Sequence, residues 1–183
     1  ESYNQWNSGS SQIDAGSVIR FSAYDKTTLS ASTGTLSRVT VASNTNWGIS
    51  TTADTIYAYL GSSATAPTTF LSAISNATDG SLVGTGLTEG TNAIRLNSIA
   101  TGATPDYAEY NGARSGAASF DAYKAQVNNV ANWTIDTTNG SYASTLPNTT
   151  AFSVTAVPEP KNYAMFLAGL GLMGLIARRK GKN

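Results

Sequence analysis

Short stretches in which apolar and polar residues alternate recur through the first 156 residues of this chain of 183 residues. Alternation of β-branched and aromatic residues with polar ones predicts half-buried strands. Residues 38–41 alternate well and residues 18–24 less regularly, whereas residues 55–60 predict a strand packed on both faces. Further strands are predicted at residues 2–7, 70–74, 93–96 and 152–154.

One segment of the same region has helical periodicity. Ser119 is suited to cap a helix N-terminus, and Asp121 lies in the first turn, where a carboxylate is favourable. An apolar stripe at helical spacing consists of Phe120, Tyr123, Val127 and Val130. We interpret this stripe as core packing rather than as a ligand groove. The expected fold class is therefore mainly β, a sandwich-like ectodomain with one short α-helix.

The C-terminal end has a different pattern, which begins with two prolines. The motif consists of Val157, Pro158, Glu159 and Pro160, and its prolines interrupt regular structure. Residues 163–177 contain no charge, and as a helix they would span about 22 Å, against a hydrocarbon core of about 30 Å. Flanking basic side chains make such a marginal span feasible. We therefore expect an exported β-rich domain at 1–156, a linker at 157–162, and a hydrophobic helix with a basic tail at 163–183.

The predicted C-terminal helix is expected to act in a membrane or as a packing element. The residues expected to contact lipid or a packing partner include large apolar side chains and small alanines. They are Tyr163, Ala164, Phe166, Leu167, Ala168, Leu170, Leu172, Leu175 and Ile176. A basic stop follows at Arg178, Arg179 and Lys180. Because basic residues stay on the cytoplasmic side, residues 1–157 are expected across the membrane. The alternative, a helix of a soluble domain, would need a polar face that the sequence lacks.

Pro158, Glu159 and Pro160, the Gly-rich apolar segment and the basic end together resemble the PEP-CTERM sorting signal of Gram-negative bacteria. This resemblance implies that the membrane enzyme exosortase recognises the signal and processes the protein near the proline motif. It also implies a transient anchor in the inner membrane, followed by a place on the cell surface or in the extracellular matrix. Proteins of this kind are typically linked to exopolysaccharide and biofilm.

A second resemblance covers residues 54–134. Its phrases, in a fixed order, are at residues 56–59, 67–71, 86–91, 109–112 and 130–134. They resemble a module of large secreted bacterial proteins that often accompanies lamin-tail-like or adhesin-like domains. The resemblance implies a structural or adhesive role and assigns no site residues.

Composition restricts the possible chemistry. The chain contains no cysteine and no histidine, which excludes disulfides and the Ser-His and Cys-His catalytic arrangements. Six of the eleven basic and ten of the eleven acidic residues precede residue 157, so the ectodomain carries a net charge of about −4 and a nucleic-acid role is not expected. The chain begins at Glu1 without a charged-then-apolar leader, so we expect a mature form whose signal peptide has been removed.

We expect no enzymatic activity and no cofactor. The most suggestive carboxylate pair, Asp106 and Glu109, is interpreted as part of a solvated loop, although a glycosidase would use two carboxylates. No calcium-loop motif is present. The alternative of a calcium site would need scattered carboxylates to converge in space, and the candidates are Asp14, Asp25, Asp54, Asp79 and Asp136.

Aromatic residues provide the remaining candidate contacts. Tyr3, Trp6 and Trp47 are candidates for stacking on sugar rings or for contacts between subunits. The N-terminal strand is expected at a free terminus, from which it could add to an open sheet of another copy. The leading hypothesis is a non-enzymatic, exported surface or matrix protein, linked to biofilm, that assembles with itself into filaments. The alternative is a monomeric exopolysaccharide-binding module released by exosortase.

Overall fold

The computed structural model describes residues 3–41, 47–48, 54–77, 81–98, 105–138, 140, 142 and 144–155. Its strands are β1 (Tyr3–Asn7), β2 (Phe21–Ser22), β3 (Ser30–Ala31), β4 (Thr35–Val39), β5 (Thr55–Ser63), β6 (Ala66–Ser75), β7 (Ala93–Arg95), β8 (Tyr107–Tyr110), β9 (Ser115–Ala117), β10 (Trp133–Asp136) and β11 (Ser153–Val154). Its helices are α1 (Phe120–Val127) and the 3-10 turns η1 (Leu96–Ser98) and η2 (Val130–Asn132).

The strands form several small sheets rather than two large ones. Antiparallel pairs join β1 with β4, β2 with β3, and β8 with β10, whereas β9 and β11 pair in parallel. The remaining sheet has the order β5-β6-β7, in which β6 and β7 are parallel. The expected mainly β class with one short α-helix is therefore confirmed. Among the described residues, the two facing layers of a sandwich are not shown.

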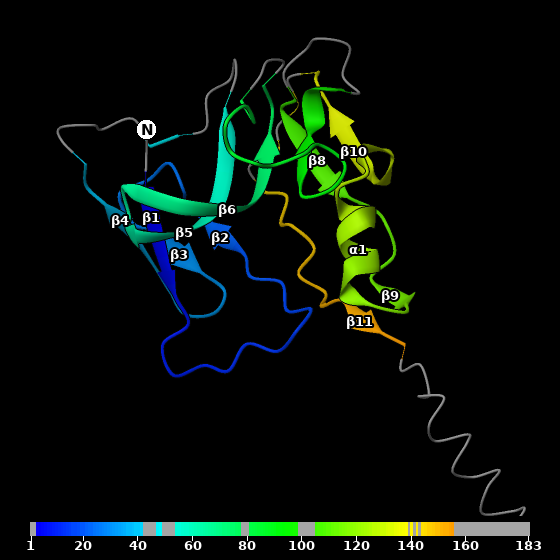
Figure 1. Cartoon of the computed structure of the whole chain (residues 1–183), viewed down its shortest axis with the longest axis horizontal. Helices are drawn as coiled ribbons and strands as arrows, with labels where there is room; N and C mark the ends of the chain where they lie inside the picture. The colour runs from blue at the N-terminus through cyan, green and yellow to red at the C-terminus, as the bar shows by residue number, and fades with distance from the viewer. Residues whose placement is uncertain are drawn as a thin grey trace, which may run out of the picture.

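The N-terminal and C-terminal halves of the described chain lie on opposite sides of the molecule. Figure 1 shows β1 to β6 on one side and β8, β9, β10 and α1 on the other. The segment that leads to β11 runs back between the two sides and ends beside β9, at one end of α1 (Figure 1). The C-terminus of the described chain is thus placed by contacts with α1 and β9.

The β5–β6 hairpin departs from the expectation of a strand buried on both faces. Burial alternates along β5, and Leu60, on the open face, is 58% exposed. On the other face Tyr57 packs against Phe70 of β6, with ring centroids 5.3 Å apart. This side joins the small core of Ala73, Leu87 and Ala93. The prediction was wrong because apolar composition alone does not show that only one face has a packing partner.

The helix begins at the predicted cap. The Ser119 side chain accepts a hydrogen bond from the N–H of Ala122, and Asp121 lies in the first turn. Tyr123 is the stripe residue that is fully buried, whereas Phe120 is 39% exposed and Val130 belongs to η2. The expectation that the whole stripe is core was therefore wrong. The helix has only eight residues, and Tyr123 is its one buried side chain.

The predicted C-terminal helix at 163–177 lies outside the described residues. Within the part of the chain that the structure describes, we find no helix with the length and apolar character needed to span a membrane. The other predicted strands overlap observed ones, although the segment at 18–24 is reduced to Phe21–Ser22 and the strand predicted at 38–41 lies at 35–39 instead.

Candidate functional site

The segment that precedes the C-terminal motif is held against β9 by its backbone. The N–H of Ser153 donates to the carbonyl of Arg114 over 2.8 Å, and the N–H of Thr155 donates to the carbonyl of Ala117 over 2.9 Å. These bonds belong to the parallel β9–β11 pair. Thr155, the last described residue, is therefore fixed in position relative to the domain.

Tyr123 links α1 to both strands of this pair. Its hydroxyl accepts a hydrogen bond from the N–H of Ala117 over 3.0 Å and donates one to the carbonyl of Ser153 over 2.6 Å. The residue is only 3% exposed, so the hydroxyl is satisfied in a site that excludes most water. One side chain thus holds the helix, β9 and β11 together.

Phe152 is the apolar anchor of the same segment. Its ring centroid lies 5.1 Å from that of Tyr123 and 5.8 Å from that of Tyr110, and the guanidinium carbon of Arg114 lies 4.8 Å from it. These are distances for favourable aromatic and cation–π contacts. The N–H of Phe152 also donates to the carbonyl of Gly16 over 2.8 Å.

Arg114 completes the anchor. It donates through Nη1 to the carbonyl of Thr150 over 2.9 Å. Thr150 lies three residues before Ser153, where β11 begins to pair with β9. Sequence reasoning missed Arg114, Tyr123 and Phe152 as a group, because they are separated along the chain and none has an unusual neighbour. The one available signal was the apolar Phe152 shortly before the proline motif.

The sorting residues predicted from the sequence lie outside the described residues. These are Val157, Pro158, Glu159, Pro160, Tyr163, Ala164, Phe166, Leu167, Ala168, Leu170, Leu172, Leu175, Ile176, Arg178, Arg179 and Lys180. The described site is therefore the junction that positions them, made by residues 150–155 and their partners on β9 and α1.

The N-terminal strand is paired within its own chain. All five residues of β1 align with β4, from Tyr3 opposite Val39 to Asn7 opposite Thr35. The expectation of an unpaired N-terminal segment was wrong, because residues 35–39, which follow β2 and β3, provide a complementary strand at long range along the chain.

The predicted tryptophan platforms already contact other residues of the chain. Trp6 donates through Nε1 to the carbonyl of Thr33 over 2.8 Å, and its ring lies 6.5 Å from that of Phe21. The guanidinium carbon of Arg38 lies 4.1 Å from the centre of the Trp47 ring.

The two candidate carboxylates lie at the start of β8: Asp106 is an exposed bend residue just before the strand, as expected, whereas Glu109 lies within it. The N–H of Asp106 donates to the carbonyl of Asp136, and Glu109 accepts a hydrogen bond from the hydroxyl of Tyr107 over 2.7 Å. The prediction of a solvated loop was wrong for Glu109, which is half-buried within β8. Of the candidate calcium ligands, Asp79 lies outside the described residues, and the others form no group of three or more metal-ligating side chains within the described part.

Two tyrosines stack beside these carboxylates. The rings of Tyr107 and Tyr142 lie 4.4 Å apart and are nearly parallel. The Tyr142 hydroxyl donates to the carboxylate of Asp136. This hydrogen bond, with a smaller effect of desolvation, raises the pKa of Tyr142 to about 12. Hydrogen bonds from Thr138 and then Tyr142 lower the pKa of Asp136.

The Tyr142–Asp136 pair predicts a pH dependence of stability at the alkaline end. Because the pKa of Tyr142 is higher in the folded chain than its ordinary value of about 10, its contribution is complete below pH about 10 and is lost as the pH rises to about 12. A spectroscopic titration of tyrosinate should show one tyrosine near 12 that Tyr142→Phe removes. Asp136→Asn should lower that pKa, and an unchanged value would contradict the assignment.

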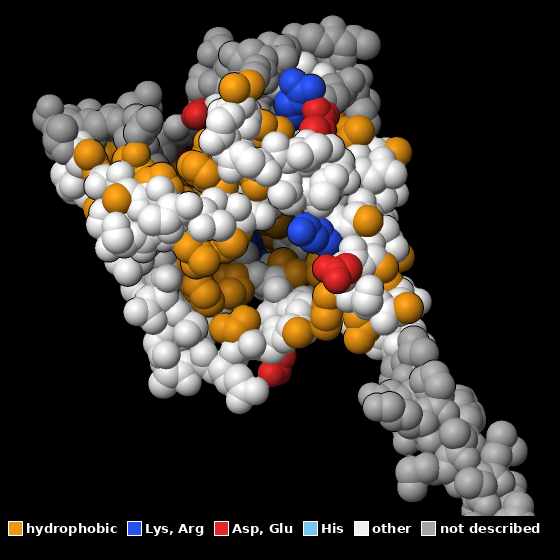
Figure 2. Space-filling view, viewed as in Figure 1, with side chains coloured by type: hydrophobic (Ala, Val, Ile, Leu, Met, Phe, Trp, Pro, Cys, Tyr) orange, Lys and Arg blue, Asp and Glu red, His pale blue; other side chains and the backbone are white. Residues whose placement is uncertain are grey.

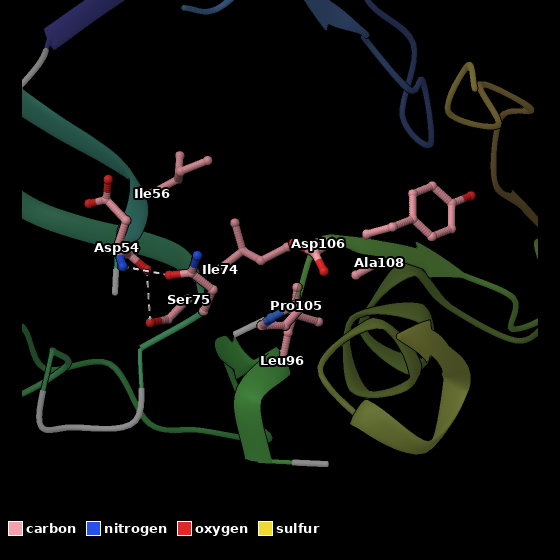
Figure 3. A pocket seen from close by; sticks show the side chains of 10 residues that line it. Asp54, Ile56, Ile74, Ser75, Leu96, Pro105, Asp106 and Ala108 are labelled. Atoms are coloured by element: carbon pink, nitrogen blue, oxygen red, sulfur yellow. Dashed lines mark hydrogen bonds between the residues drawn. The ribbon is translucent and has the colours of Figure 1, made fainter. Parts of the chain in front are cut away.

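A cavity of about 360 Å³ lies between the β5–β6–β7 sheet and β8. Figure 3 shows Ile56 and Ile74 opposite Asp106 and Ala108, and the lining also includes Asp54. The volume is within the range of small-ligand sites. With two carboxylates in its wall, the cavity favours a neutral or cationic ligand over an anionic one.

A second cavity, of about 320 Å³, lies between α1 and β6. Figure 2 shows the corresponding face hollowed, with hydrophobic side chains gathered around the hollow. The lining combines Phe120, Val127 and Phe152 with the polar side chains of Ser72 and Asn128. Phe152 therefore faces both the junction and this hollow.

Comparison with known proteins identifies the segment that the junction positions. Residues 156–180 match the family described as the PEP-CTERM protein-sorting motif. The match begins one residue after Thr155. Neither curated proteins nor solved structures gave a match to the chain.

The match places the chain's C-terminal segment among PEP-CTERM sorting signals. The chain carries a PEP-CTERM sorting signal, which indicates an exported protein that exosortase sorts and that passes through a membrane-associated stage during processing. The resemblance expected from the proline motif, the apolar segment and the basic end is thus confirmed.

Proposed function

We propose that this chain is a non-enzymatic structural protein of the cell surface or extracellular matrix, linked to biofilm, which assembles into filaments after export. The observation that carries this proposal is the junction: a folded β-rich domain holds the chain up to Thr155, and the segment that matches the sorting motif begins at residue 156. A protein built in this way delivers its whole folded part outside the inner membrane.

The chemistry of the described carboxylates supports a non-enzymatic role. Glu109 and Asp136 each accept a hydrogen bond from a tyrosine hydroxyl, and the chain has no histidine or cysteine. Carboxylates used in this way stabilise local structure, and catalysis by a carboxylate pair needs both groups directed at a substrate.

The contact that supports assembly is the outer strand of the three-stranded sheet. β5 is nine residues long, and among the described residues β6 is its one neighbour in the sheet. Its open face carries Leu60, which is 58% exposed. Long edge strands with apolar side chains are templates for pairing with another chain. This contact replaces the donation of β1, which is paired internally.

Negative-stain microscopy of the purified exported protein tests the proposal. We expect filaments for the unaltered chain and single globules for Ala58→Lys combined with Leu60→Lys, because charged residues on an edge strand oppose pairing. Both positions are exposed, so stability should change by less than about 0.5 kcal/mol per substitution. Val83→Lys, at an exposed turn residue, is the matched control and should leave filaments intact.

Filaments that persist in the double variant would contradict the role of β5. A chain that stays monomeric at every concentration, and binds purified exopolysaccharide, would instead support the alternative of a saccharide-binding module. The specific observation that favours this alternative is the cavity lined by Asp54 and Asp106. Asp106→Ala should then weaken binding, whereas Trp6→Ala should affect binding only through stability, because Trp6 is engaged with Thr33 and Phe21.

A further inference from the structure

The surface from which the chain continues towards the sorting motif is exposed and almost uncharged. We define it as the exit face, made by residues 115–121 and 153–155. Asp121 is the only charged residue of these two segments, and most of their other side chains are small. Two larger apolar side chains are present: Phe120 at the start of α1 and Val154 on β11, which are 39% and 38% exposed.

The sorting motif is tied closely to this surface. The N–H of Thr155 is hydrogen-bonded to Ala117, and Pro158 is three residues further along the chain. Three extended residues span at most about 10 Å. An enzyme that holds residues 158–160 in its cleft must therefore come within about 10 Å of the exit face.

We propose that the exit face is a docking surface for exosortase, which contacts it while the sorting motif occupies the enzyme. This inference rests on sorting by exosortase and adds a second point of recognition, on the folded domain. Small side chains let a protein partner approach the backbone closely, and the partly exposed Phe120 and Val154 supply apolar contacts. A surface that binds anionic lipid would instead carry clustered lysines or arginines.

The junction favours docking with β11 still in place. Release of residues 150–155 would break the backbone bonds of Phe152, Ser153 and Thr155, together with the bonds from Tyr123 and Arg114. It would also expose the Phe152 ring, which packs against Tyr110 and Tyr123. The enzyme therefore meets a preformed surface rather than a detached peptide, and no ordering of that surface is required on binding.

The first test separates the exit face from the sorting motif along the chain. A flexible ten-residue Gly-Ser linker is inserted between Thr155 and Ala156, and the fraction of processed chain is followed by pulse-chase in cells that contain exosortase. We expect processing to slow by about 5-fold. Once the exit face is bound to exosortase, the linker lowers the effective concentration of the sorting motif at the enzyme's cleft. Val154→Asp should slow processing similarly with an unchanged melting temperature, whereas Val83→Asp, the same change at an exposed turn residue, should not.

The second test fixes β11 to β9. Ser115 and Ser153 are aligned in the parallel pair. Because the chain contains no cysteine, the double substitution Ser115→Cys and Ser153→Cys gives one defined disulfide crosslink. We expect the crosslinked chain to be processed at the unaltered rate. Processing that requires reduction of the crosslink, or that is unchanged or faster with the linker, would overturn the proposal. Equal processing of the unaltered chain without exosortase would instead refute the sorting assignment itself.

Discussion

Replacement of Gly16 with alanine should destabilise the domain by about 3 kcal/mol. Gly16 has a φ of +87°, and an added Cβ would lie 2.1 Å from the carbonyl oxygen of Phe152 and 2.8 Å from the ring of Phe120. The same glycine accepts the hydrogen bond from the N–H of Phe152. The substitution therefore combines backbone strain with displacement of the segment that anchors the sorting signal. Urea unfolding followed by circular dichroism measures the change.

Gly9→Ala is the matched control for this prediction. Gly9 also has a positive φ, of +63°, but nothing lies within 4 Å of an added Cβ. It should cost only the conformational term, about 1 kcal/mol. The difference between the two variants isolates the contact with Phe152. Equal effects of the two substitutions would show that residues 150–155 are not held against the loop at Gly16.

Local features of this fold were predictable because they depend on neighbours in the sequence. The capping of α1 by Ser119 needs only a side-chain oxygen three residues before an N–H group, so the sequence was sufficient. Strands β5 and β6 follow from β-branched and aromatic composition. The sorting motif was recognisable for a similar reason, since its three elements are contiguous.

The contacts that position the junction were not predictable, because they join distant segments. The parallel pairing of β9 with β11 leaves no periodic signal in two- and three-residue strands. Tyr123 was expected in the core, but its hydroxyl bonds to Ala117 and Ser153 depend on where three elements meet. The pairing of β1 with β4 likewise joins strands that are separated by β2 and β3, and the alternation pattern does not specify which strand pairs with which.

Deletion of residues 1–7 should destabilise the domain by at least about 3 kcal/mol, a large share of the stability of a typical domain. The deletion removes every β1 partner of β4, the Trp6–Phe21 contact and the bond from Trp6 to Thr33. Urea unfolding measures the loss. A synthetic peptide of residues 1–9 added to the truncated chain should restore part of it, and the same peptide with Trp6→Ala should restore less.

Concentration dependence separates this internal pairing from donation of β1 to another copy. A strand that pairs within its own chain gives a melting temperature independent of protein concentration, whereas a donated strand ties folding to association. The Ala58→Lys and Leu60→Lys variant, which should not assemble through β5, is the appropriate background for the measurement. We expect its melting temperature to stay constant over a concentration range of about 100-fold. A rise with concentration would return β1 to the role of an exchanged strand and would make the N-terminus, rather than β5, the assembly contact.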